Sequence, residues 1–106
     1  MRLEPGEVEA IRAAAAEVLP PGSVVRLFGS RVDDARRGGD IDLHVEVPEA
    51  LDARGRVRLA TALVADIWMR TGEAQHIDVV VLAAGQPERR IDQAARRDGL
   101  VLHGRG

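Results

Sequence analysis

Residues 40–47 read Asp-Ile-Asp-Leu-His-Val-Glu-Val, an alternation of polar and apolar side chains that Pro48 ends. Because successive side chains of a β-strand point to opposite faces, this alternation predicts a half-buried strand. The apolar members would face a core, and the polar members Asp40, Asp42, His44 and Glu46 would share the other face. This is the strongest strand signal in the chain.

Outward from this strand, helices and strands follow one another at short intervals. The apolar spacing predicts helices over residues 7–19, 30–36, 53–70 and 87–98, and further strands over residues 24–28, 76–82 and 100–103. Pro20-Pro21-Gly22 ends the first helix, and Gly72 is a plausible C-cap of the long one. Without repeats or linkers, the 106 residues predict a single domain over 1–106, with one core and no room for a second substrate domain.

The composition excludes several kinds of chemistry. The chain has no Lys, Tyr, Asn or Cys, which excludes a Walker-type lysine, a Schiff-base enzyme and a cysteine nucleophile. All fifteen basic residues are Arg, which suits bidentate binding of phosphate. A net charge of −2, with Phe28 and Trp68 as the only aromatic residues, argues against nucleic acid as a partner. No apolar run is long enough for a bilayer and the N-terminus lacks a signal core, so we expect a cytoplasmic protein.

Gly29-Ser30 lies between a predicted strand and a predicted short helix. Glycine lets the backbone turn tightly and approach a ligand closely. Free amides at a helix start form an anion site, to which Ser30 adds a hydroxyl donor and Arg31 a guanidinium that can fork onto phosphate oxygens. The sequence therefore predicts a phosphate-binding turn at residues 29–31.

Three aspartates complete a possible metal site. Asp40 and Asp42 lie on one face of the same strand, roughly 6.5–7 Å apart along the chain. Asp78 interrupts the otherwise apolar strand 76–82, where a lone buried carboxylate would be costly without a partner. Mg²⁺ typically takes one or two carboxylates together with substrate phosphates, so these acids predict metal-assisted phosphoryl chemistry.

Taken together, these motifs resemble the nucleotidyltransferase superfamily of DNA polymerase beta, and in size its minimal single-domain members. The resemblance covers roughly residues 8–82, and nine residues separate Ser30 from Asp40. The segments that carry it are Leu27-Phe28-Gly29-Ser30-Arg31, Arg36, Asp40-Ile41-Asp42-Leu43 and Ile77-Asp78-Val79. The chain departs from many relatives at Gly39, where they carry Ser, and at His44, where they carry an apolar residue.

The resemblance implies an α/β fold of the α+β type: a small mixed β-sheet with helices packed mainly on one face, the nucleotidyltransferase fold. It also implies that Gly29, Ser30, Arg31 and Arg36 bind the nucleotide. Two Mg²⁺ ions, bound by the acidic residues Asp40, Asp42 and Asp78, would assist transfer of AMP from ATP, and those three acids would be the catalytic residues. Relatives of this size are commonly paired with a HEPN-domain toxin, which implies such a protein as acceptor.

Other interpretations stay open. The chain could neutralise a partner by binding alone, or act on a small molecule such as an aminoglycoside. Taken singly, a Gly-Ser turn or an Asp-x-Asp pair is most often structural, and Arg36 could equally cap a short helix. We expect His44 and His76 to be solvated rather than metal ligands, because imidazole favours softer metals than magnesium. The pairs Arg89-Arg90 and Arg96-Arg97 are expected to lie on exposed helix faces.

Overall fold

The computed structural model describes residues 3–29 and 41–105. The predicted helix 30–36, with the site residues Ser30, Arg31, Arg36 and Asp40, lies outside these residues. The described elements are α1 (Pro5–Val18), β1 (Val24–Phe28), β2 (Ile41–Glu46), α3 (Ala53–Thr71), β3 (Ile77–Leu82), α4 (Arg90–Asp98) and β4 (Leu100–His103). Each predicted element within the described residues is confirmed, with bounds that differ by a few residues.

The strands form one mixed sheet in the order β3-β2-β1-β4. β1 pairs antiparallel with both β2 and β4, whereas β2 and β3 run parallel. The parallel pair requires a crossover connection, and α3 supplies it. The mixed sheet confirms the expectation that the resemblance implied.

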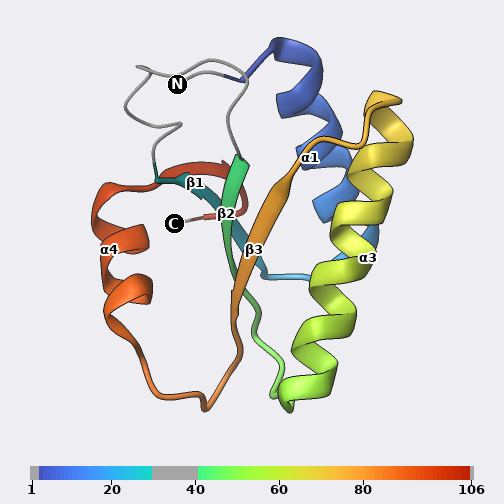
Figure 1. The fold of residues 1–106 in the computed structure, drawn as a ribbon. Helices are drawn as coiled ribbons and strands as arrows, with labels where there is room; N and C mark the ends of the chain where they lie inside the picture. The colour runs from blue at the N-terminus through green and yellow to red at the C-terminus, as the bar shows by residue number, and fades with distance from the viewer. Residues whose placement is uncertain (1–2, 30–40, 106) are drawn as a thin grey trace.

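The described helices cover both faces of this sheet. α1 and α3 pack side by side on one face, and α4 lies across the opposite face (Figure 1). The main core lies between the sheet and the α1–α3 layer, where Leu27, Leu43 and Leu63 are fully buried. The apolar side of β2 faces this core, as its alternation predicted, so its polar side faces α4.

Local signals explain where the helices begin and end. The Asp52 carboxylate accepts a hydrogen bond from the Gly55 amide at 2.7 Å and caps α3, and Gly72, with a φ of +76°, ends it. The last helix was predicted to begin at Pro87, but it begins at Arg90. The reason is that Arg89 is its N-cap residue, and the Arg89 amide donates to the Asp92 carboxylate at 2.8 Å.

None of the helices in the described part of the chain combines the length and the apolar character that crossing a bilayer requires.

Candidate functional site

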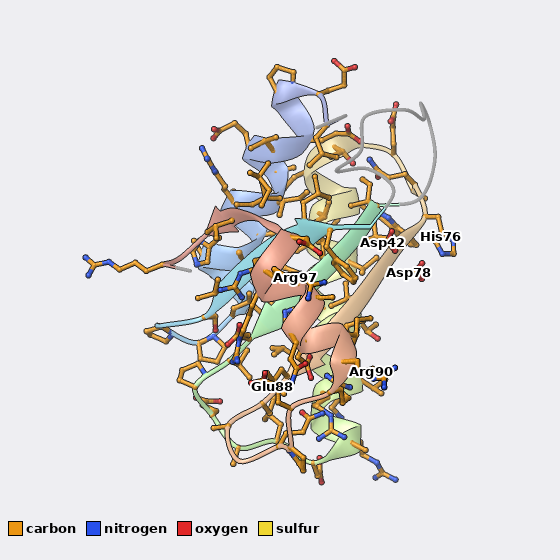
Figure 2. The ribbon with its side chains drawn as sticks, turned by 90° about the vertical axis from the view of Figure 1, so that its left-hand side faces the viewer. Asp42, His76, Asp78, Glu88, Arg90 and Arg97 are labelled. Atoms are coloured by element: carbon orange, nitrogen blue, oxygen red, sulfur yellow. The ribbon has the colours of Figure 1, made fainter. Side chains whose placement is uncertain are left out.

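Two of the three predicted acids lie next to each other on neighbouring strands. Asp42 and Asp78 are partners in the parallel register of β2 and β3, so their side chains leave the same face of the sheet. Both lie one residue inside the strand start, at the corner labelled in Figure 2. The structure therefore brings Asp42 and Asp78 together at an open corner, where the side chain of Asp78 is 57% exposed.

The backbone at Gly29 comes close to this pair. Gly29 follows directly after β1, whose last residue, Phe28, is the register partner of Asp42. Its φ is +83°, a left-handed conformation that glycine adopts most readily. A Cβ built on Gly29 would lie only 2.6 Å from Oδ2 of Asp42. The turn after β1 therefore lies so close to the Asp42 carboxylate that only glycine, which has no side chain, fits at position 29.

We expect Gly29→Ala to disturb this corner. The added methyl group would push the Asp42 carboxylate away and hold the backbone in a disfavoured φ, at a cost of about 1–3 kcal/mol. Thermal unfolding should show that loss, and titration with Mn²⁺ followed by electron paramagnetic resonance should show weaker metal binding. Gly85→Ala is the matched control, because Gly85 also has a positive φ but nothing lies within 4 Å of its Cβ position. Equal metal binding by the two variants would contradict a role for the Gly29–Asp42 contact.

His76 is the second polar neighbour of the acid pair. Its Nε2 lies 3.0 Å from Oδ1 of Asp78, and the two side chains are 64% and 57% exposed. The expectation that His76 is exposed is confirmed, although the ring is hydrogen-bonded to the carboxylate rather than only to water. The imidazole thus restricts one oxygen of the Asp78 carboxylate.

The donor set fits a hard divalent cation. Two carboxylates with room for phosphate oxygens are the usual protein contribution to a Mg²⁺ site. Within residues 3–29 and 41–105, no group of three or more His, Asp or Glu side chains is arranged to hold a metal ion. Asp42 and Asp78 are the described carboxylates that meet at this corner, and Asp40, the third predicted ligand, is not among the described residues.

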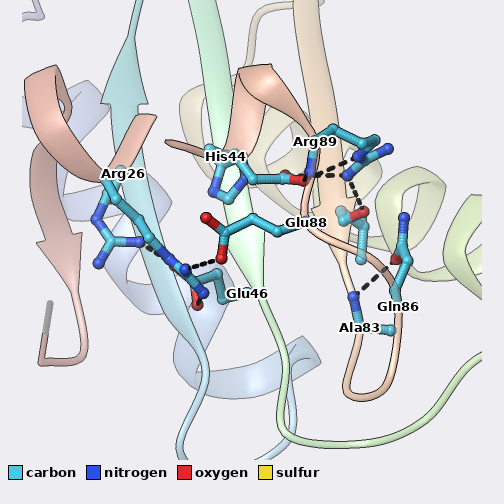
Figure 3. A network of polar contacts seen from close by, with 10 residues as sticks. Arg26, His44, Glu46, Ala83, Gln86, Glu88 and Arg89 are labelled. Atoms are coloured by element: carbon cyan, nitrogen blue, oxygen red, sulfur yellow. Dashed lines mark hydrogen bonds and ion pairs between the residues drawn. The ribbon is translucent and has the colours of Figure 1, made fainter. Parts of the chain in front are cut away.

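Beside the corner lies a buried polar network that we did not predict (Figure 3). His44 was expected to be solvated, but it is fully buried beneath α4, and its Nε2 lies 2.7 Å from Oδ1 of Asp92. Arg89 also binds the Asp92 carboxylate, with Nε–Oδ2 and Nη2–Oδ1 distances of 2.9 and 3.0 Å. The expectation of solvation was wrong because α4 covers the polar side of β2. The spacing of Asp92 and Ala95, both on the buried stripe of α4, was the available signal.

The hydrogen bonds of this network determine which of its atoms carry protons. Burial alone would raise the pKa of Asp92, but the hydrogen bonds from Arg89 and His44 hold that pKa well below its ordinary value. Because the ionised carboxylate only accepts, His44 Nε2 must donate to it. Among the described buried side-chain atoms, His44 Nδ1 is the one without a hydrogen-bond partner. An unpaired buried polar atom costs about 1–3 kcal/mol, so an apolar residue would fill this place more cheaply.

A second network ties the far end of β2 to α4. The Glu46 carboxylate accepts from Arg96 through both oxygens, at 2.9 and 2.8 Å, and from Arg26 Nη1 at 2.5 Å. Arg96 also pairs with Glu88. Arg96 lies on an exposed face of α4, as expected, and it also links that helix to the sheet. The hydrogen bond from Arg96 is the largest cause that lowers the Glu46 pKa, from 4.5 to about 2.

This shift predicts a specific acid sensitivity. Glu46 binds its proton more weakly in the folded chain than in the unfolded chain, so its ionised form stabilises the fold above pH 4.5. That contribution should disappear as the pH falls from about 4.5 to about 2. Thermal unfolding across this range should show a steep loss of stability, and Glu46→Gln should make the curve shallower. An unchanged slope in Glu46→Gln would contradict the assignment.

Comparisons with known proteins bear on the fold. No family model and no curated protein match the chain. The crystal structure of a toxin–antitoxin with AMP-PNP matches with a TM-score of 0.65 and 23% identity, over 92% of this chain and 73% of that one. The toxin–antitoxin MntA–HepT matches with a TM-score of 0.60 and 21% identity, over 93% and 71%.

A mutant of that complex, with two aspartates two positions apart replaced by glutamate, matches with a TM-score of 0.63 and 21% identity, over 92% and 73%. At such identities the likeness establishes the fold: this chain has the fold of a chain found in toxin–antitoxin complexes.

Proposed function

We propose that this chain is a Mg²⁺-dependent nucleotidyltransferase that transfers AMP from ATP to a protein partner, a HEPN-type toxin. The observation that carries the proposal is the register pairing of Asp42 with Asp78 beside the Gly29 turn. The shared fold supports it, because one matching toxin–antitoxin structure holds AMP-PNP and another was altered at two aspartates spaced like Asp40 and Asp42.

Each predicted residue has a place in this proposal. Asp40, Asp42 and Asp78 would hold two Mg²⁺ ions, which would neutralise charge on the phosphates and lower the pKa of the acceptor hydroxyl. The backbone at Gly29 would approach the triphosphate, and Ser30, Arg31 and Arg36 would bind its oxygens.

The reaction follows from this arrangement. The acceptor oxygen forms a bond to the α-phosphorus of ATP while the bond from that phosphorus to the bridging oxygen breaks, and pyrophosphate leaves. Asp78 accepts the hydroxyl proton. The open corner at Asp78 suits an acceptor carried by another protein, because the described residues leave that carboxylate more than half exposed.

The proposal is tested by incubating the purified chain with ATP, Mg²⁺ and the product of the neighbouring gene, followed by intact-mass spectrometry. We expect the partner to gain AMP, and chelation with EDTA to abolish the gain. Protection against the partner without a mass change would favour a binding module. Modification of an aminoglycoside in the absence of any protein would instead favour a small-molecule acceptor.

A further inference from the structure

His44 lies two residues after Asp42 on the same face of β2, yet it cannot touch a ligand because it is fully buried. The His44 and Phe28 rings pack in a T-shaped arrangement, with centroids 6.2 Å apart and an angle of 87° between their planes. Phe28 is the register partner of Asp42 and the residue before Gly29. A path of direct contacts therefore leads from His44 through Phe28 to the turn beside the Asp42 carboxylate.

The far side of the His44 ring is held just as directly. The Asp92 carboxylate accepts from Nε2 at 2.7 Å and is itself bound by Arg89. These bonds hold the imidazole in place, and so maintain its T-shaped contact with Phe28. The unpaired Nδ1 makes the arrangement less stable than an apolar one, so stability alone does not explain a histidine here.

We infer that His44, oriented by Asp92, is a positioning residue that braces the Phe28 ring and thereby holds the Gly29 backbone at the phosphate-binding turn. This inference extends the proposed function and rests on it, because the turn at Gly29 matters only if the chain binds a nucleotide. The brace itself is a property of the chain without ligands, so it can be tested even if no nucleotide binds.

The test compares His44→Leu and the double variant His44→Leu/Asp92→Leu with the unaltered chain. The double variant removes both buried partners, so neither is left without the hydrogen bond between them. Isothermal titration should show that the dissociation constant for Mg²⁺-ATP rises about tenfold in both variants, or ~1.4 kcal/mol. Without nucleotide, the backbone NMR order parameters of Phe28 and Gly29 should fall below the value of about 0.85 typical of rigid backbone.

Ile67→Val is the matched control, because Ile67 is buried on α3, on the opposite face of the sheet. It should lower the melting temperature but leave both the ATP affinity and the two order parameters unchanged. Unchanged order parameters in the His44 variants would overturn the brace. Failure of the unaltered chain to bind ATP would instead overturn the proposed function, while the order parameters still decide the brace.

Discussion

Asp42→Asn should reduce Mg²⁺-dependent nucleotidyl transfer by about three orders of magnitude, since metal-ion stabilisation of developing charge is worth several kcal/mol. An amide keeps the shape of the side chain but removes the negative charge that Asp42 offers to a cation. It also removes repulsion from Asp78, its partner across β2 and β3. The measurement is transfer of label from α-labelled ATP to the partner, with a melting curve for each variant.

Asp98→Asn is the matched control for this experiment. Asp98 is an exposed carboxylate that pairs with Arg97 at 3.0 Å, outside the acid corner. The Asp98→Asn variant should transfer label at the same rate as the unaltered chain. If Asp42→Asn kept the full rate, the catalytic assignment of the corner would fail. If it lost transfer but still protected against the partner, inhibition by binding would be the main activity.

The strand β2 and the acidic residues Asp42 and Asp78 could be predicted because each is marked by the pattern of polar and apolar residues around it. Strict alternation over residues 40–47 identifies the strand and its core face without reference to any other element. An aspartate within the apolar run of β3 indicates a partner nearby, and the register places Asp78 opposite Asp42. The mixed order of the strands followed from the resemblance rather than from these patterns.

The surroundings of His44 could not be predicted in the same way. Alternation shows that His44 lies on the polar side of β2, but not that a helix 48 residues further along the chain covers that side. The covering depends on long-range packing of α4, which is held by Asp92, Arg89, Arg96 and Glu46 rather than by apolar contacts alone. A periodic apolar stripe along α4 would have identified its buried face. The buried face of α4 instead carries Asp92, and in the sequence a charged residue looks like part of a solvated face.

Asp92→Ala should be among the most destabilising single changes on the α4 side of the sheet. It removes the hydrogen-bond acceptor of the buried His44 and the acceptor for the Arg89 amide at the start of α4. Each buried donor left without an acceptor typically costs about 1–3 kcal/mol. For a chain of this size, each kcal/mol lost should lower Tm by roughly 4–8 °C. Thermal and urea unfolding followed by circular dichroism would measure it.

Gln93→Ala is the control for this prediction, because Gln93 is the exposed neighbour of Asp92 in the same helix. Its effect should stay within about 0.5 kcal/mol. Replacing both His44 and Asp92 by leucine should cost less than Asp92→Ala alone, because the double variant no longer leaves the buried Nε2 donor of His44 unpaired. Equal melting temperatures of Asp92→Ala and Gln93→Ala would contradict this prediction. They would mean that apolar packing holds α4 against the sheet and that the polar contacts of Asp92 add no net stability.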